Sequence, residues 1–293
     1  MPALQATVCK LTACKLTFCK LTFFKLTFFK LKGALFYGVL FCLCLPPTTL
    51  AVPLCPAARI DEAAVVRSVT DGDTLRLKDG RKLRLIGINA PELAHDNRPA
   101  QPLGHDAKTA LSRLLAQTHN RINLEYGSER QDKYQRTLAY VYLADGRSLQ
   151  VGLLESGMAT AFTTPPNHDH GDCYRLVEQG AIQQRRGVWA LDDYQLMQVN
   201  QLKSGDDGFR RIRGQVSRIH SGSDATWIML GEKFKIRIAA NDILYFKQDG
   251  LQQLPGKTIE VRGWLHAEHY PFFMQLRHPD GMQLPDAALK LSK

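Results

Sequence analysis

Three short stretches of this sequence bring carboxylates and arginines close together. Residues 71–74 (Asp-Gly-Asp-Thr) place two carboxylates at a tight turn, and residues 84–92 run from an arginine through an asparagine to a glutamate. Residues 132–136 (Asp-Lys-Tyr-Gln-Arg) add a second arginine. Guanidinium groups bind phosphate in a bidentate manner, carboxylates hold hard cations, and a glutamate can take a proton from water.

Each stretch, taken singly, also has an ordinary structural explanation. An Asp-Gly-Asp sequence is common in hairpin turns, and this one is too short for the twelve-residue loop of an EF-hand. An arginine in a strand usually faces solvent, and Arg136 has a possible surface partner in Asp132. The combination of the three stretches, more than any one of them, indicates a functional site.

Short strands are expected to position these residues. Residues 64–92 read as a three-strand meander whose third strand is 83–88, with turns at 71–73 and 78–81 and a stop at Pro91. Helices are expected at 104–117, 148–157 and 172–186, and further strands at 121–126 and 137–143. Five short strands, with a helix after the third and another at the end, predict a small barrel of the oligonucleotide-binding (OB) type.

A second domain follows a polar, glycine-bearing linker at 200–208. Strand patterns resume at 209 and again suggest five strands, with a helix near 241–248 between the third and fourth. We expect a smaller OB-like accessory domain at 209–285, which makes the fold class mainly β with α (α+β). Its basic strand positions and aromatic residues either bind nucleic acid or form solvated faces and core; they are Arg210, Arg211, Arg213, Lys233, Lys235, Arg237, Tyr270, Phe272 and Phe273.

Together, the three stretches resemble the staphylococcal-nuclease-like (thermonuclease) family. The resemblance runs from about Val65 to Trp189, ends in Gly-Val-Trp, and covers most of an expected nuclease domain at 64–190. It implies a five-stranded OB-type barrel and a calcium-dependent hydrolase that cuts phosphodiester bonds of DNA, RNA or both. It also implies a nucleic-acid substrate, whereas no protein partner is evident.

The resemblance implies a metal site as well. Asp73 matches the family's calcium-ligating aspartate, Asn89 stands where the family usually has a second ligating aspartate, and Ala90 matches a position whose backbone carbonyl completes the site. Asn89 keeps an oxygen ligand but removes a negative charge, which weakens calcium binding. Either Asp71 compensates, or metal affinity is low, or a different divalent cation is used.

The remaining matches concern the substrate. Glu92 corresponds to the glutamate that activates or positions the attacking water, and Arg84 and Arg136 correspond to the two phosphate-binding arginines. Tyr134 corresponds to a tyrosine near the bound phosphate, and its neighbour Lys133 is a further substrate-binding candidate. Two permanently charged, bidentate guanidinium groups suit the negative charge that grows around phosphorus during hydrolysis.

Two other readings of the chain remain open. With the charge at position 89 missing, the first domain could be a nucleic-acid-binding module without catalysis, and a purely structural envelope protein is a weaker option. His168, Asp169 and His170 with Cys173 do not have standard zinc spacing, so we expect an exposed loop there.

Charge by itself does not indicate nucleic-acid binding. The formal net charge is +10, but residues 1–57 hold six lysines and no acid, whereas residues 58–202 hold 18 basic and 18 acidic side chains. A hydrophobic fraction of 44% and a charged fraction of 23% exclude wholesale disorder and a multi-span membrane protein. More than half of the excess charge therefore belongs to the N-terminal leader.

Residues 1–57 read as a five-residue repeat followed by a signal peptide. The apolar run at 33–45 follows lysines, is broken by two prolines, and precedes small residues with plausible cleavage sites after Ala51 or Ala57. The run is shorter than a membrane span, so we expect a periplasmic or secreted protein with no stable span, and a membrane-anchored one if cleavage fails. Cleavage after Ala51 leaves Cys55 and Cys173, which form one disulfide or remain two free thiols.

Overall fold

The computed structural model describes residues 54–94 and 99–284. The leader and signal peptide predicted at 1–57 therefore lie almost wholly outside the described residues. None of the helices in the part of the chain that is described is long and apolar enough to cross a bilayer.

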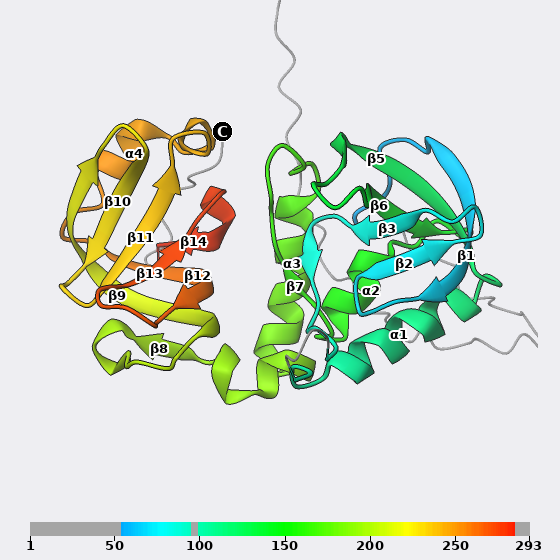
Figure 1. The fold of residues 1–293 in the computed structure, drawn as a ribbon, viewed down its shortest axis with the longest axis horizontal. Coiled ribbons are helices and arrows are strands. Elements are labelled where there is room, and N and C mark those ends of the chain that lie inside the picture. Colours follow the sequence, from blue (N-terminus) through cyan, green and yellow to red (C-terminus); the bar gives the residue numbers. More distant parts are fainter. Residues whose placement is uncertain (1–53, 95–98, 285–293) are drawn as a thin grey trace, which may run out of the picture. The chain divides into compact units, whose positions relative to one another are not determined.

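The first domain contains the predicted five-stranded barrel. Its strand order is β1-β2-β3-β6-β5, with β3 and β6 parallel and β1 and β5 closing the barrel (Figure 1). This order is the Greek-key pattern of an OB-type barrel, so the predicted fold class is confirmed. The strands are β1 (Glu62–Val69), β2 (Thr74–Leu77), β3 (Lys82–Leu85), β5 (Arg121–Gln131) and β6 (Thr137–Leu143).

The third strand is shorter than predicted. It ends at Leu85, because Gly87 has a φ of 82°, and a Cβ at Gly87 would lie 2.6 Å from the Tyr174 ring. The chain then forms β4 (Ile88–Asn89), which pairs with β7 (Thr160–Ala161) in a separate two-stranded sheet. Because of this break, Asn89 belongs to the two-stranded sheet and not to the barrel.

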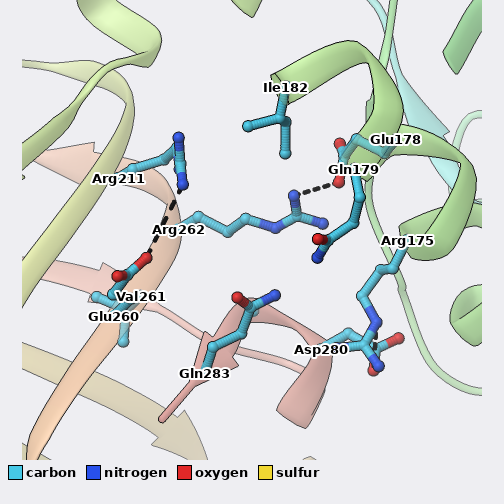
Figure 2. A pocket seen from close by; sticks show the side chains of 11 residues that line it. Arg175, Glu178, Gln179, Ile182, Arg211, Glu260, Val261, Arg262, Asp280 and Gln283 are labelled. Carbon is cyan, nitrogen blue, oxygen red and sulfur yellow. Dashed lines mark hydrogen bonds and ion pairs between the residues drawn. The ribbon is translucent and has the colours of Figure 1, made fainter. Parts of the chain in front are cut away.

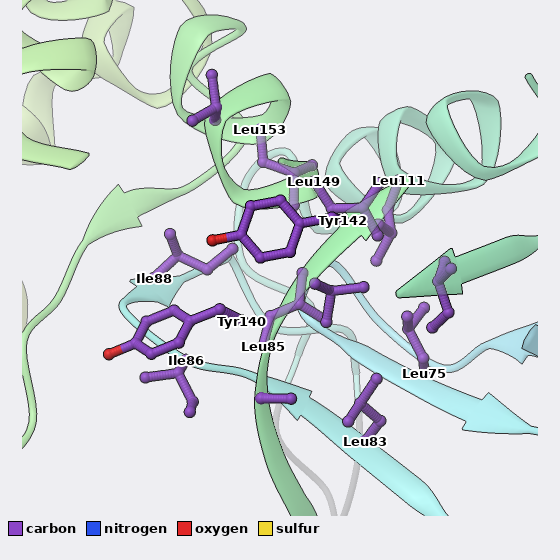
Figure 3. Packing of buried hydrophobic residues seen from close by; sticks show 14 of the residues in the cluster. Leu75, Leu83, Leu85, Ile86, Ile88, Leu111, Tyr140, Tyr142, Leu149 and Leu153 are labelled. Carbon is purple, nitrogen blue, oxygen red and sulfur yellow. The ribbon is translucent and has the colours of Figure 1, made fainter. Parts of the chain in front are cut away.

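Apolar side chains from the strands and two helices form the first core. Helix α1 (Gly104–Ala116) contributes Ala107, Leu111 and Leu115, and α2 (Leu149–Glu155) contributes Leu149 and Leu153 (Figure 3). The Ser148 hydroxyl accepts a hydrogen bond from the Val151 amide at 3.3 Å and so caps α2. Each fully buried leucine contributes roughly 1.5–3 kcal/mol to folding.

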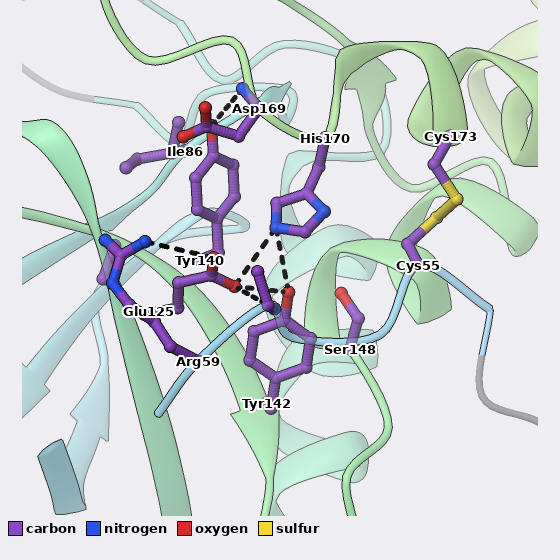
Figure 4. Close-up of polar contacts among 12 residues, drawn as sticks. Cys55, Arg59, Ile86, Glu125, Tyr140, Tyr142, Ser148, Asp169, His170 and Cys173 are labelled. Atoms are coloured by element: carbon purple, nitrogen blue, oxygen red, sulfur yellow. Dashed lines mark hydrogen bonds and ion pairs between the residues drawn. A yellow bond between two sulfur atoms is a disulfide. The ribbon is translucent and has the colours of Figure 1, made fainter. Parts of the chain in front are cut away.

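A buried polar cluster and a disulfide anchor α3 (Gly171–Gln183) to this barrel. The Glu125 carboxylate lies 3.1 Å from both the His170 ring and the Tyr142 hydroxyl, and the Cys55 and Cys173 sulfurs are bonded (Figure 4). His168 and Asp169 are exposed as expected, but His170 is largely buried. The expected exposed loop is therefore wrong for His170, because Glu125 offers its ring a buried acceptor.

The second domain repeats the same strand order in a second five-stranded barrel. Strands β9 to β13 close through a β9–β12 pairing, and β11 and β13 are parallel. The strands are β9 (Gly208–Ser221), β10 (Ala225–Leu230), β11 (Phe234–Ala239), β12 (Thr258–His266) and β13 (Phe272–Gln275). Phe272 is buried in the second core, so it is not available to stack bases.

Several short elements of the second domain differ from the sequence prediction. The helix expected near 241–248 is a 3-10 turn, η4 (Ile243–Tyr245), followed by α4 (Gln248–Gln252). Two further strands, β8 (Leu196–Gln198) and β14 (Met282–Gln283), extend the sheet beyond the barrel. Within the polar segment 200–208, Leu202 is buried in the second core.

Arginines of β9 and β12 form ion pairs. Arg262 of β12 pairs with Glu178 of α3, and Arg211 of β9 pairs with Glu260 (Figure 2). Arg213 of β9 pairs with Glu260 as well. Burial lowers the pKa of Arg211, and Glu260 partly opposes that effect. Because carboxylates already neutralise them, these arginines are poor candidates for binding nucleic acid.

Candidate active site

Close packing around Gly72 positions the neighbouring Asp73, just before β2. A Cβ at Gly72 would lie 2.6 Å from the Ala90 Cβ and 2.8 Å from the Ala107 Cβ, so only glycine fits there. The turn therefore draws the next residue inward, and Asp73 is only 3% exposed.

Three groups contact the buried Asp73 carboxylate. The Ala90 amide donates to Oδ2 at 2.8 Å, the Thr74 hydroxyl donates to Oδ1 at 3.2 Å, and Arg84 Nη1 lies 2.5 Å from Oδ2. Burial raises the pKa of Asp73 to about 7, although Arg84 opposes the shift. The carboxylate thus lies where further positive charge would be favourable.

Arg84 connects the two side chains that were predicted to hold a metal. Its Nη2 donates to Asn89 Oδ1 at 3.0 Å while its Nη1 pairs with Asp73. Asp73 from the bend before β2 and Asn89 from β4 therefore present their oxygens to one guanidinium. Ala90 joins the group through its amide.

Glu92 has a fixed backbone and a free carboxylate. Its amide donates to Gln101 Oε1 at 3.0 Å, and its carbonyl accepts from the Gln101 amide at 2.9 Å. A Cβ at Gly104 would lie 2.6 Å from the Glu92 carbonyl oxygen, so the start of α1 also presses against this residue. Among the described residues its carboxylate has no hydrogen bond or ion pair, and it faces solvent.

A tight turn before β6 presents Arg136. Asp132 accepts from the Arg136 amide at 2.9 Å and from its Nε at 2.7 Å, and Gln135 has a φ of 62°. The two terminal nitrogens of Arg136 make no hydrogen bond within the described chain. Tyr134, which is 67% exposed, lies beside them, with Arg136 Cζ 5.6 Å and Lys133 Nζ 5.0 Å from its ring centroid.

Two adjoining hollows bring the predicted residues together. Glu92 lines one of about 530 Å³ together with Asp71, and Arg84 lines another of about 490 Å³ together with Lys133; Tyr134 and Arg136 line both. Asp73 and Asn89 reach this surface through their contacts with Arg84. All the predicted catalytic, metal and substrate positions therefore lie in one region.

Sequence reasoning missed two supporting residues. Gln101, which fixes the Glu92 backbone, lies in a loop without any pattern that would single it out. Lys82, which lines the same hollow as Glu92, reads in the sequence as an ordinary strand residue. The described residues contain no cluster of three or more His, Cys, Asp or Glu that could hold a metal ion.

Comparisons with known proteins show which family this part of the chain belongs to. A family model described as staphylococcal nuclease homologue matches residues 82–191. A thermonuclease of Staphylococcus intermedius is 38% identical over 131 residues, which cover 44% of this chain and 76% of that protein. The chain belongs to the staphylococcal nuclease homologue family.

Two further relatives match a similar length of the chain. A thermonuclease of Staphylococcus hyicus is 34% identical over 125 residues, or 42% of this chain and 72% of that protein. Endonuclease YncB of Bacillus subtilis is 36% identical over 129 residues, or 42% of this chain and 60% of that protein. The resemblance predicted from the sequence is confirmed, and the second barrel lies beyond the residues that the family model matches.

Proposed function

We propose that this protein is an exported, metal-dependent nuclease that hydrolyses phosphodiester bonds of DNA, RNA or both. The observation that carries the proposal is the convergence of Arg84, Glu92 and Arg136 on adjoining hollows beside the buried Asp73. Membership of a family that contains thermonucleases and endonucleases supports it.

The two arginines would bind and stabilise the phosphate. Arg136 offers two terminal nitrogens that have no other partner in the described chain, while Asp132 fixes its direction through Nε. Arg84 is held nearby by Asp73 and Asn89. A fixed guanidinium group such as that of Arg136 is effective in this role because it needs no reorganisation as negative charge develops on the phosphate oxygens. The terminal nitrogens of Arg84 would bind phosphate after a cation takes over the oxygens of Asp73 and Asn89.

Asp73 and Asn89 would hold the divalent cation. Their oxygens already share one cationic partner, and the Asp73 carboxylate is buried with its charge only partly compensated, so the donors fit a hard ion such as calcium. When bound, such an ion supplies positive charge beside the reacting phosphate. With one carboxylate and one amide as side-chain donors, we expect weaker calcium affinity than two carboxylates would give.

Glu92 would orient the attacking water and accept its proton. Its carboxylate is exposed and unpaired within the described residues, and it lines the same hollow as Arg136. A base in this position needs only to reach the water, because the backbone contacts with Gln101 already fix its place.

Export is proposed from the N-terminal signal, and the Cys55–Cys173 disulfide supports it. Disulfides persist in oxidising compartments such as the periplasm and the extracellular medium. We therefore propose a periplasmic or secreted enzyme.

A nucleic-acid-binding module without catalysis is the alternative, and Asn89 is the observation that favours it. Digestion of single-stranded DNA, double-stranded DNA and RNA, with calcium and with a chelator, separates the two. We expect calcium-dependent cleavage that the chelator abolishes. Binding without cleavage at any calcium concentration would establish the alternative, and cleavage that the chelator leaves intact would contradict the metal site.

A further inference from the structure

The outside of the second barrel carries two cross-strand rows of basic and aromatic side chains. In each row, residues on neighbouring strands stand directly opposite one another. The first row is Arg218, Met229, Lys235, Phe273 and His266; the second is His220, Trp227, Arg237 and Gln275. We call these two rows the basic–aromatic face.

The strand pleat turns this face away from the core. Successive side chains of a strand point to opposite sides, and the alternate residues Ile228, Ile236 and Met274 are fully buried. Strands β10 and β11, which are the second and third strands of this barrel, lie in the middle of the rows. These are the strands on which OB-type barrels commonly bind oligonucleotides.

Cations and rings touch each other on the basic–aromatic face. Lys235 Nζ lies 4.4 Å from the centroid of the Trp227 ring, and Arg237 Cζ lies 6.0 Å from it. The rings of His266 and Phe273 stack with centroids 4.5 Å apart and an interplanar angle of 17°. Flat rings and positive charges are therefore available at the same place.

The positive charge of the basic–aromatic face is largely unneutralised. Neither row contains a carboxylate, and within the described residues Lys235 and Arg218 form no ion pair. Arg237 has one partner, Asp224, at 3.5 Å, and the Asp224 side chain is 73% exposed, so solvent screens the pair. By contrast, Arg211 and Arg213 of the same barrel are paired with Glu260.

We infer that the basic–aromatic face binds single-stranded nucleic acid. A single strand offers a phosphate backbone to Lys235 and Arg237 and unpaired base faces to Trp227 and Phe273, whereas a duplex hides its base faces. The binding itself does not depend on the chemistry proposed for the first barrel. The consequence of binding for turnover rests on the proposed nuclease function. A strand bound to this face raises the local substrate concentration, which lowers KM for long substrates and leaves kcat unchanged.

Binding of a fluorescent oligothymidylate of about 16 nucleotides to the full, disulfide-bonded chain tests the inference. Anisotropy is measured in a chelator, so that no cleavage occurs, over a range of salt concentrations. For Lys235→Gln/Arg237→Gln we expect affinity to fall about tenfold, and the salt slope to fall by about 1.4 because each lost phosphate contact removes about 0.7. The matched charge control, Lys247→Gln/Lys257→Gln, removes two cations of the same barrel outside the face and is expected to bind like wild type.

Trp227→Leu tests the stacking contribution. We expect affinity to fall by about 5- to 100-fold with an unchanged salt slope, because loss of a stacked base removes no charge. Wild-type affinity in both Lys235→Gln/Arg237→Gln and Trp227→Leu would overturn the inference. An equal loss of binding to heparin or to anionic vesicles in these variants would also overturn the inference, because it would assign the face to a different partner. Because binding is measured without turnover, the binding result can be interpreted even if the proposed nuclease activity is not found.

Discussion

The two barrels of this protein share a strand order but differ in what they place at equivalent positions. Thr74, at the start of the second strand of the first barrel, pairs with Arg84; Ala225, at the start of the second strand of the second barrel, pairs with Ala239. The residue just before this second strand is the buried Asp73 in the first barrel and the exposed Asp224 in the second. One fold thus provides a set of positions, and the side chains placed there decide the chemistry.

The approach to the last strand differs in the same way. In the first barrel a turn held by Asp132 presents Arg136 before β6, whereas in the second barrel the exposed Tyr270 comes just before β13. Among the described residues, the first barrel therefore presents a fixed cation and a carboxylate without a partner. The second presents rings beside cations of which Lys235 has no ion pair and Arg237 has one exposed partner, Asp224. We interpret this difference as a division of roles between a proposed catalytic site in the first barrel and a proposed substrate-binding site in the second.

Substituting one arginine in each barrel tests this division most strongly. We expect Arg136→Ala to lower kcat by about 10²–10³, the usual cost of removing one group that stabilises developing charge. Arg237→Ala is expected to leave kcat unchanged and to raise KM for long substrates only. Steady-state kinetics on long and short oligonucleotides measure both values, and equal effects of the two substitutions on kcat would contradict the division.

Arg136 is the better choice for this test than Arg84. Removal of Arg84 would leave the buried Asp73 carboxylate without its ion-pair partner, a loss that typically costs about 3–5 kcal/mol in stability. Arg136 is partly exposed, and its side chain contacts a single carboxylate, so its loss should spare the fold.

The disulfide is expected to stabilise the first barrel and not the second. Cys55→Ala/Cys173→Ala is expected to lower the free energy of unfolding of the first barrel by about 2–5 kcal/mol, because the bond closes a long loop. The second barrel contains no cysteine and should retain its stability. Hydrogen exchange resolved by peptide can measure each barrel, and an equal loss of protection in both would show that they unfold as one unit.

Asp280 contacts Thr163 and Arg175, and we expect the strength of these contacts to depend on pH. Burial raises its pKa, but a hydrogen bond from His278 and the charge of Arg175 outweigh burial and leave the pKa at about 2. Its carboxylate also accepts a hydrogen bond from Thr163 at 2.7 Å. A lowered pKa means that its stabilisation is present above the ordinary value of 3.8 and is lost as pH falls toward about 2.

We therefore expect Asp280→Asn to lower the free energy of unfolding by about 2 kcal/mol near pH 6. The difference from wild type should be mostly lost near pH 2, where about half of the wild-type carboxyl groups are protonated. Denaturant unfolding at several pH values measures this, and a difference that stays constant with pH would contradict the ionic role of Asp280.

The smallest expected effect concerns the metal site proposed for the first barrel. Asn89→Asp restores a second carboxylate beside Asp73, and we expect the calcium concentration for half-maximal activity to fall on the order of tenfold. Turnover at saturating calcium should stay close to wild type. An unchanged calcium requirement would show that position 89 does not contribute to the metal site.

Local patterns in the sequence predicted much of the fold. Alternating apolar residues and glycine turns gave the strands of both barrels, and the order of strands and helices gave their OB-type class. The break after the third strand was not predicted, because it depends on Gly87 meeting Tyr174, which is far away in sequence. The short strands β8 and β14 were missed for a similar reason, since three or two residues carry too little pattern.

The candidate site followed from spacing within each motif, but its supports did not. Asp73, Arg84 and Arg136 lie in short motifs whose types and spacing are informative in the sequence. Gln101 contacts Glu92 across a loop with no pattern. On the second barrel, alternation indicated which basic residues point outward. It did not indicate that Arg211 and Arg213 meet Glu260 of β12, a strand that is far away in sequence and adjacent in the barrel, so only the structure separates them from Lys235.

Turnover of Glu92→Gln is the decisive test of the proposed role of Glu92 as the base that activates water. The substitution keeps the size of the side chain and removes its ability to take a proton. With saturating calcium and a single-stranded oligonucleotide, we expect kcat to fall by about 10²–10⁴, while the affinity for the oligonucleotide in chelator stays at the wild-type value. A kcat close to that of the wild type would show that Glu92 does not activate the water and would contradict the proposed active site.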